Sequence, residues 1–422
     1  MKRILVFCFA VCCLQTRAQI FTPKADLPQP LERSFSFMLD DKLYTGTGRD
    51  NEGVMTNHVW QYDAATDAWT PQNDFPTPPA RNGLAMVIDG TAYAGLVWDG
   101  VSSSGVNGVR SWYRYAPQSD TWIPQADVPD SVDVGGFAAV FELNGIGYAV
   151  CGSGINGEMN KVAAYDPVTD SWTQKNDFPG AARDFAFGVA IGNYAYVGLG
   201  DFFFNAPFYS DCYQYDPVAD SWTPIAPIPP LESGTTVSGA CFSSCAYNGK
   251  VLLMNVNFQD GNSAEEYASF FVYDPPTDTW TIYEGANMYE LFRATPVFGQ
   301  YGPDIYLGGG QSAATASVAA DFWQINLADI VLDLTEKQPE PEQFRVTTDG
   351  RWMSVAAPEA IFRHFDAQGL SLNLYGIAGQ VLARFPLTEP ARFDLSGLPG
   401  GPVVWAITAG NRPIRSGKTI LY

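Results

Sequence analysis

Arginine and aromatic residues are the side chains of this chain best suited to bind a ligand. Four arginines recur shortly before predicted strands, and four bulky aromatics stand in two predicted loops. The arginines are Arg33, Arg81, Arg183 and Arg293, and the aromatics are Trp98, Phe203, Phe204 and Tyr209. Arginine binds carboxylates through paired hydrogen bonds, and aromatic rings stack on the apolar faces of sugars. These residues predict a site for an anionic or sugar-like ligand, unless the arginines pair with acids between repeats and the aromatics only pack.

Residues that would support metal or nucleophilic catalysis are scarce. The chain has two histidines, His58 and His364, too few for a histidine-built zinc or copper site, and neither lies in a nucleophile motif. No phosphate-binding loop or dinucleotide fingerprint is present. The acidic segments 50–52 and 260–262 do not follow the spacing of a calcium loop, and Arg49 beside the first would repel a cation. We therefore expect no metal and no cofactor.

The elements that would position the arginines come from a repeated segment with tyrosine first, aspartate sixth and tryptophan eighth. Its five copies span 62–69, 115–122, 165–172, 215–222 and 273–280. Their closing tryptophans are 53, 50, 50 and 58 residues apart. Asp, Pro, Ser and Thr in the middle are typical of a hairpin turn. The tyrosine and tryptophan are therefore expected on two adjacent strands, filling the space between neighbouring units.

Repeats of this kind, at a period of about 50 residues, resemble those of the kelch family. The resemblance covers roughly the first three quarters of the chain and implies one four-stranded sheet, or blade, per repeat. Small residues end the predicted second strands at 46–48, 152–154, 198–200 and 308–310. Glycine there would let a neighbouring blade approach the backbone closely. The corresponding segments of blades two and five, 93–97 and 252–256, depart from this pattern.

The sixth repeat is incomplete at its C-terminal side. Residues 321–327 predict its third strand, and no fourth strand follows them. Residues 20–28 align with the fourth-strand segments that begin at Trp69 and Trp172. We therefore expect the N-terminal residues to complete blade six, because a closed ring leaves no edge strand unprotected. The prediction is an all-β chain with a six-bladed kelch-type β-propeller over 19–328.

The predicted propeller would gather the arginines on one face. In an up-and-down blade, the loops from the fourth strand to the next first strand and from the second to the third strand emerge together; we call this the loop face. Long second-to-third loops are expected at 50–57, 98–109, 201–210 and 258–267. Because the four arginines precede first strands, we expect each of them to approach the axial channel on the loop face.

Composition and the N-terminus suggest an exported protein. With 24 basic and 45 acidic residues, the chain has a formal charge of −21, which argues against nucleic acid and anionic membranes as partners. Lys2 and Arg3 precede an apolar run over 4–14, and a small residue, Ala18, stands at the expected cleavage site. We predict a signal peptide over 1–18 and no transmembrane anchor, because the run is too short. Cys12 and Cys13 leave a lipoprotein alternative open.

Four cysteines remain after the predicted cleavage: Cys151, Cys212, Cys241 and Cys245. The last two stand on one predicted strand, about 13 Å apart, too far for a disulfide unless the strand is broken. We expect buried small hydrophobic residues, with a pairing between other members left open.

A second domain is predicted after a charged, proline-rich linker over 329–342. Short alternating strand patterns over 343–422 suit a small β-sandwich. Segments 374–380, 393–401 and 410–418 resemble the C-terminal sorting domain of bacterial type IX secretion. The motif positions are Tyr375, Gly379, Asp394, Leu395, Gly401 and Lys418. The chain departs from the family at 401–404 and at its final two residues. The resemblance implies export by the secretion machinery, followed by release or surface attachment.

Three functions agree with these features. The first is a secreted or cell-surface binding module, expected to be a monomer, that recognises a glycan or protein with its loop face. The second is a sugar mutarotase similar to N-acetylneuraminate epimerase, with Arg183 and Asp184, or Arg33 and Glu32, as the reacting groups. The third is a structural surface or adhesin component. The absence of recognisable catalytic groups favours the first.

Overall fold

The computed structural model describes the chain in segments that form two compact units, Met1–Asp329 and Ile330–Tyr422. The described residues are 21–98, 109–154, 157–202, 207–231, 234–256, 270–283, 292–312, 315–327, 345–348, 352–356, 370–376, 381–398, 400–409 and 412–421. Their named elements are all strands. Within these ranges, no helix is long and apolar enough to cross a membrane. The predicted signal peptide and linker lie outside the described residues.

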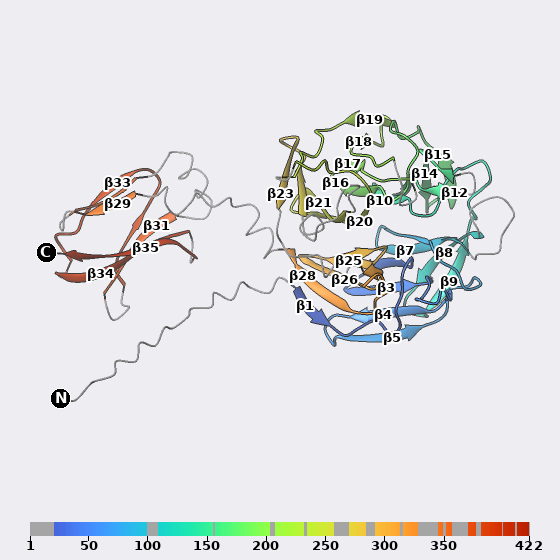
Figure 1. Ribbon diagram of the computed structural model, residues 1–422, viewed down its shortest axis with the longest axis horizontal. Coiled ribbons are helices and arrows are strands. Elements are labelled where there is room, and N and C mark those ends of the chain that lie inside the picture. Colours follow the sequence, from blue (N-terminus) through green and yellow to red (C-terminus); the bar gives the residue numbers. More distant parts are fainter. Residues whose placement is uncertain are drawn as a thin grey trace, which may run out of the picture. The chain divides into compact units, whose positions relative to one another are not determined.

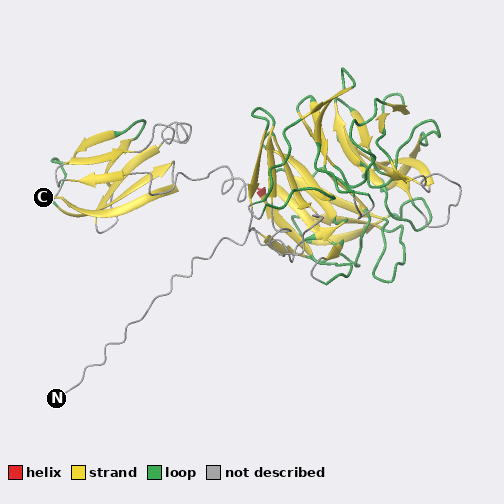
Figure 2. Ribbon diagram, turned by 45° about the horizontal axis from the view of Figure 1, so that its top comes forward, coloured by secondary structure: helices red, strands yellow, loops and turns green. Residues whose placement is uncertain are grey.

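In the described part of the first unit, six four-stranded antiparallel sheets form the blades of a propeller, beside two two-stranded sheets (Figures 1 and 2). Blade one holds β2 (Phe35–Leu39), β3 (Lys42–Gly46), β4 (Val59–Asp63) and β5 (Ala68–Gln72). Blade two holds β6 (Leu84–Ile88), β7 (Thr91–Val97), β8 (Val109–Ala116) and β9 (Thr121–Gln125). Blade three holds β10 (Ala139–Leu143), β11 (Ile146–Val150), β14 (Val162–Asp166) and β15 (Ser171–Gln174).

The other three blades follow the same order from first to fourth strand. Blade four holds β16 (Phe187–Ile191), β17 (Tyr194–Gly198), β18 (Cys212–Asp216) and β19 (Ser221–Pro224). Blade five holds β20 (Cys241–Tyr247), β21 (Lys250–Val256), β22 (Phe270–Asp274) and β23 (Thr279–Tyr283). Blade six holds β25 (Val297–Tyr301), β26 (Asp304–Gly308), β28 (Phe322–Asn326) and β1 (Phe21–Lys24). Blades two and five are complete although their second strands depart from the glycine pattern.

The N-terminal strand closes the ring. β1 pairs antiparallel with β28, with Phe21 opposite Ile325 and Lys24 opposite Phe322. In Figure 1 the blue β1 lies beside the orange β28, although about 300 residues separate them in the chain. The first strands line the inside: β2 lies against β6 and β25, β10 against β6 and β16, and β16 against β20. The starts of these first strands therefore surround the propeller axis.

The repeated turn links each blade to its neighbour. Its tyrosine hydroxyl donates to the aspartate five residues later in all five copies: Tyr62–Asp67 at 2.7 Å, Tyr115–Asp120, Tyr165–Asp170 and Tyr273–Asp278 at 2.8 Å, and Tyr215–Asp220 at 2.6 Å. The same aspartate accepts a backbone N–H from the residue after the preceding blade's fourth strand, as Asp67 does from Ala25 at 2.9 Å. The role expected for this aspartate lies within the turn, and the structure shows that it also joins blades.

The glycines that end the second strands have a different role from the expected one. A Cβ at Gly198 would lie 2.5 Å from Sγ of Cys212 and 2.7 Å from the carbonyl oxygen of Asp211, both in the same blade. Glycine is needed there because the third strand of its own blade is crowded against it. Close approach between blades occurs instead in a first strand, where a Cβ at Gly299 would lie 2.5 Å from Leu43 of blade one.

The second unit contains two antiparallel sheets. One has the order β29 (Arg345–Thr348), β30 (Trp352–Ala356), β33 (Ala391–Asp394), and the other β32 (Val381–Pro386), β31 (Leu370–Gly376), β34 (Gly401–Ala409), β35 (Arg412–Leu421). A single hydrophobic cluster draws on both, including Met353 of β30 and Leu372 of β31.

The residues matched to the sorting motif are spread over this unit. Tyr375 is half-buried in β31, Asp394 ends β33, Leu395 is buried in the cluster and Gly401 begins β34. Lys418 pairs with Val404 through β35, and Gly379 lies outside the described residues. A sorting role for these residues stays a prediction.

Candidate ligand site at the propeller axis

One residue from each blade stands two positions before the first strand, and together these six form a ring. They are Arg33, Asn82, Phe137, Phe185, Gly239 and Thr295, all with positive φ between 50° and 124°. Five of them are not glycine, so the surrounding structure must hold this unfavourable backbone conformation. Backbone hydrogen bonds join neighbours in the ring, with Asn82 N–H donating to Arg33 O at 2.8 Å and Phe185 N–H to Phe137 O at 3.1 Å.

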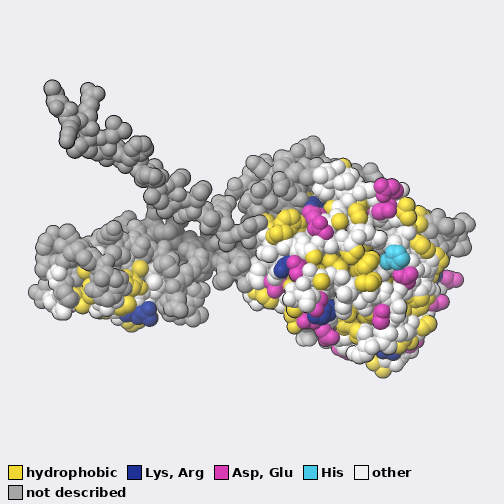
Figure 3. Space-filling model, turned by 90° about the horizontal axis from the view of Figure 1, so that it is seen from below, with side chains coloured by type: hydrophobic (Ala, Val, Ile, Leu, Met, Phe, Trp, Pro, Cys, Tyr) yellow, Lys and Arg dark blue, Asp and Glu magenta, His cyan; other side chains and the backbone are white. Residues whose placement is uncertain are grey.

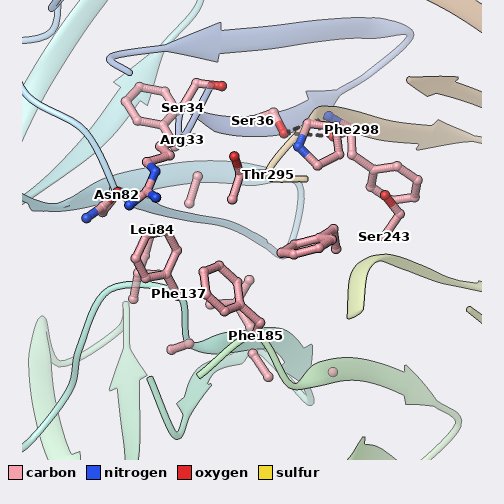
Figure 4. Close-up of a pocket in the computed structure, with 18 of the residues that line it drawn as sticks. Arg33, Ser34, Ser36, Asn82, Leu84, Phe137, Phe185, Ser243, Thr295 and Phe298 are labelled. Atoms are coloured by element: carbon pink, nitrogen blue, oxygen red, sulfur yellow. Dashed lines mark hydrogen bonds between the residues drawn. The ribbon is translucent and has the colours of Figure 1, made fainter. Parts of the chain in front are cut away.

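A pocket of about 280 Å³ opens inside this ring, and all six blades contribute to its wall. It lies where first strands begin, and its lining includes Arg33, Phe137, Phe185 and Thr295. Figure 4 shows the Arg33 side chain reaching toward Asn82 and Phe137, with Phe185 beside Phe137. We call this cavity the axial pocket.

The axial pocket is divided into a polar side and an aromatic side. Blades six, one and two supply the polar groups, which are Thr295, Arg33, Ser34 and Asn82. Blades three, four and five supply Phe137, Phe185 and Phe242, whose rings are 4.4 and 5.2 Å apart between successive centroids. Such a wall suits a ligand with a polar edge and a flat apolar face.

Arg33 is the charged group of the polar side. Its side chain is 12% exposed, its guanidinium carbon lies 5.4 Å from the Phe137 ring centroid, and its Nε lies 3.7 Å from Oε1 of Glu32. Burial lowers the pKa of Arg33, and the Glu32 carboxylate partly opposes this shift. Because the pKa of a free guanidinium is so high, Arg33 stays cationic.

Neutral groups beside Arg33 have hydrogen-bonding capacity left. Oδ1 of Asn82, Oγ1 of Thr295 and Oγ of Ser34 have no partner within the described part of the chain. Ser36 differs, because its hydroxyl donates to Phe298 O at 2.8 Å and so joins blade one to blade six. The polar side therefore offers one cation and three neutral groups to a ligand.

The predicted loop face is present. Bridges between Glu32 and Arg49, between Arg81 and Trp98, and between Asp184 and Asp201 hold the segments before first strands against the second-to-third loops. Arg81 stands three residues before its strand, one position away from the ring. Its guanidinium carbon lies 4.4 Å from the Trp98 ring centroid, at the rim of the axial pocket rather than in its lining.

Arg183 and Arg293 do not approach the axial channel, which corrects the expectation for both. They stand four residues before their strands. Arg183 is fully buried and donates to both carboxylate oxygens of Asp211, at 2.7 and 2.9 Å. Arg293, 4% exposed, pairs with Asp321. These two arginines pair with acids, as the alternative interpretation of the sequence stated. Each pair lies within one blade, however, and not between neighbouring repeats.

The predicted aromatic loop residues contribute little to the described site. Tyr209 packs on Arg183, with the guanidinium carbon 4.1 Å from its ring centroid. Phe203 and Phe204 lie outside the described residues. Of the eight predicted ligand residues, the structure brings Arg33 into the axial pocket and places Arg81 and Trp98 together at its rim.

Comparisons with known proteins agree with this architecture. Kelch-like protein 25 of Xenopus tropicalis is 26% identical over 274 residues, covering 63% of this chain and 42% of that protein. Kelch-like protein 35 of Mus musculus is 28% identical over 264 residues, covering 62% and 40%. The chain thus spans about two fifths of the length of these relatives. No family model matches it.

Among solved structures, the structure of YjhT matches with a TM-score of 0.55 at 17% identity, covering 71% of this chain and 95% of that one. The first unit is a kelch-type β-propeller. In this kelch propeller, blade two keeps a glycine, Gly95, in the same register as Gly198, and a Cβ there would lie 2.1 Å from Ser111 O. Blade five pairs its first two strands with Val256 at the end of the second.

The acids considered for catalysis lie outside the axial pocket of the kelch propeller. Glu32 is 4% exposed and accepts from Nε of Arg49 at 2.5 Å, and Asp184 is fully buried. His58 is exposed and lies 2.8 Å from Asp74. No carboxylate or imidazole belongs to the described residues that line the pocket. The described wall therefore offers no carboxylate or imidazole for proton transfer.

The four cysteines are free and buried, as expected. Cys241 lines the axial pocket, and burial raises the pKa of its thiol to about 12. It is a neutral, small wall residue.

Sequence reasoning missed most of the pocket wall. Asn82, Phe137, Phe185 and Thr295 were not predicted, although all share one position relative to the repeat. The signal was the register, two residues before each first strand. The four predicted arginines do not share this register, because they stand two, three or four residues before their first strands.

Proposed function

We propose that this protein is an exported binding module whose kelch propeller binds a small acidic ligand, such as the carboxylate-bearing end of a glycan, in the axial pocket. The observation that carries the proposal is the division of the pocket wall. A largely buried arginine and neutral hydrogen-bonding groups line one side, and three phenylalanines in tilted and edge-to-face contact line the other. A carboxylate would meet Arg33, and an apolar ring face would lie on Phe137 and Phe185.

The size of the axial pocket supports a compact ligand. Its volume of about 280 Å³ is at the lower end of the range of about 300–1,000 Å³ for small-molecule sites. A single sugar residue fits such a volume, and a longer glycan would continue onto the loop face. Asn82, Ser34 and Thr295 would bond to its hydroxyl or amide groups.

Export rests on the predicted signal peptide and on the resemblance of residues 343–422 to a sorting domain. We propose an extracellular or outer-membrane surface location, with the secretion machinery as partner of the second unit. Fusing residues 343–422 to a reporter, in a host with type IX secretion, tests this. Reporter in the medium or on the surface supports it, and retention in the periplasm contradicts it.

A mutarotase and a purely structural component are the alternatives. The burial of Asp184 and the pairing of Glu32 with Arg49 disfavour acid–base chemistry in the pocket. We expect that the protein does not accelerate anomeric exchange of N-acetylneuraminate, as followed by NMR. A clear acceleration that Arg33→Ala abolishes would favour the enzyme.

Calorimetry with the mature protein, residues 19–422, tests the binding proposal. N-acetylneuraminate and glucuronate are compared with glucose and N-acetylglucosamine as neutral controls. We expect the acids to bind and Arg33→Ala to weaken them by about tenfold or more. Arg114→Ala is the matched control, because Arg114 lies in β8 and outside the pocket lining. Absence of binding by every acid, or equal binding by Arg33→Ala, contradicts the proposal.

A further inference from the structure

Two arginines of blades one and two lie side by side at the rim of the axial pocket. Gly48 N–H donates to Ala80 O at 2.7 Å, so the segments that continue into Arg49 and Arg81 are backbone neighbours. Arg49 is bridged to Glu32, and Arg81 to Trp98. These paired segments hold both arginines on the loop face by backbone hydrogen bonds rather than by a flexible loop alone.

This rim has an excess of positive charge. Glu32 accepts from Arg49 at 2.5 Å and lies 3.7 Å from Arg33 Nε. Arg81 forms no ion pair with any carboxylate of the described residues. Three guanidinium groups therefore lie near Glu32, with the carboxylate of Asp184 also acting on Arg33, in a chain whose formal charge is −21. Figure 3 shows the opposite balance on the face seen there, where acidic side chains are scattered with few basic ones. A local field of this sign attracts anions.

Arg81 is held ready for such an anion. Its guanidinium carbon lies over the Trp98 ring, 4.4 Å from the centroid, and its buried Nε has no hydrogen-bond partner within the described part of the chain. Burial, with the nearby charges of Arg49 and Arg33, lowers the pKa of Arg81 to about 10. A bound anion would relieve this unfavourable setting.

We propose that Arg49 and Arg81, with Trp98 supporting Arg81, form a clamp for a tetrahedral oxyanion ester, a sulfate or phosphate group carried by the glycan that the loop face binds. A sulfate or phosphate ester directs three terminal oxygens in different directions and can accept from guanidinium groups on two sides, whereas a carboxylate directs its two oxygens within one plane. The inference rests on the proposed binding role of this face, but its residues differ from the pocket wall.

Calorimetry with the mature protein tests the clamp. Inorganic sulfate and phosphate are titrated against chloride at equal ionic strength, followed by glucosamine 6-sulfate, glucosamine 6-phosphate and unmodified glucosamine to distinguish the two esters. We expect Arg81→Ala to weaken binding by about tenfold or more, and Trp98→Ala by a smaller factor. Arg81→Lys should give intermediate binding, because it keeps the charge and loses the paired geometry. Arg114→Ala should match the wild type.

The outcomes separate the clamp from the axial pocket. If Arg81→Ala and Arg81→Lys bind sulfate and phosphate like the wild type, or if neither anion binds, the clamp is wrong. If Arg33→Ala removes the binding and Arg81→Ala does not, the anion occupies the axial pocket and the clamp is again wrong. If the oxyanions bind through Arg81 while no carboxylated sugar binds, the clamp holds and the proposed pocket ligand fails.

Discussion

Arg183 and Asp211 form a bidentate ion pair inside blade four, with N–O distances of 2.7 and 2.9 Å. The arginine side chain is fully buried, and that of Asp211 is 35% exposed. A third hydrogen bond, from Arg183 to Leu199 O at 2.9 Å, fixes the end of the second strand to the same group. The pair holds the start of the first strand against the start of the third. Its role is structural.

Asp211→Ala should lower the free energy of unfolding by about 3 kcal/mol, because it leaves a buried guanidinium without its carboxylate. Urea unfolding measures this. Asp177→Ala is the control, since Asp177 forms an exposed pair with Lys161 at 2.7 Å, and such pairs contribute about 0–1 kcal/mol. An equal decrease in the free energy of unfolding in the two variants would show that the buried pair contributes no more than the exposed one.

Asp220→Ala should destabilise the propeller by about 1–3 kcal/mol, because it leaves the buried hydroxyl of Tyr215 unsatisfied. It also removes the acceptor of the Asn176 backbone N–H from blade three. Tyr215→Phe should have a smaller effect, and a double-mutant cycle should give a favourable coupling between the two. Additive losses would mean that the tyrosine and the aspartate act independently.

Stability should fall at acid pH. The backbone N–H of Ala25 and the Tyr62 hydroxyl lower the pKa of Asp67. A carboxylate whose pKa is lower in the folded than in the unfolded protein stabilises the fold fully above its unfolded pKa, near 3.9. This stabilisation is lost as the pH falls through the folded pKa. Thermal unfolding between about pH 5 and 2 should show a smaller decrease for Asp67→Asn than for the wild type. An unchanged pH dependence would contradict the assignment.

Removing β1, residues 21–24, should lower the melting temperature and cause concentration-dependent association. The deletion exposes the edge of β28, whose backbone groups now pair with β1. Light scattering and thermal unfolding test this, with deletion of residues 19 and 20 alone as the control. If the shortened protein stays monomeric and equally stable, the N-terminal strand is not needed for closure.

The repeat, the turn within it and the incomplete sixth unit are recognisable from the amino-acid sequence alone. The aspartates that open the turns, such as Asp166, accept an N–H two residues ahead, at 2.8 Å, as turn chemistry predicts. The strand at 21–24 could be found because it shares side chains with the fourth strands of complete repeats. These features depend on residues close together in the chain or on similarity between repeats, so they can be recognised without a structure.

Which side chains face the axis depends on how the blades pack. Arg33, Arg81 and Arg183 differ by single positions relative to a first strand, and they lie in the axial pocket, at its rim and inside blade four. The ring that orients Arg33 needs backbone bonds such as Asn82 N–H to Arg33 O, across 49 residues of chain. Successive residues of an extended chain point in opposite directions, so a shift of one position changes the environment completely. Packing between blades selects that position, so the repeat register becomes informative only once the structure shows which position faces the axis.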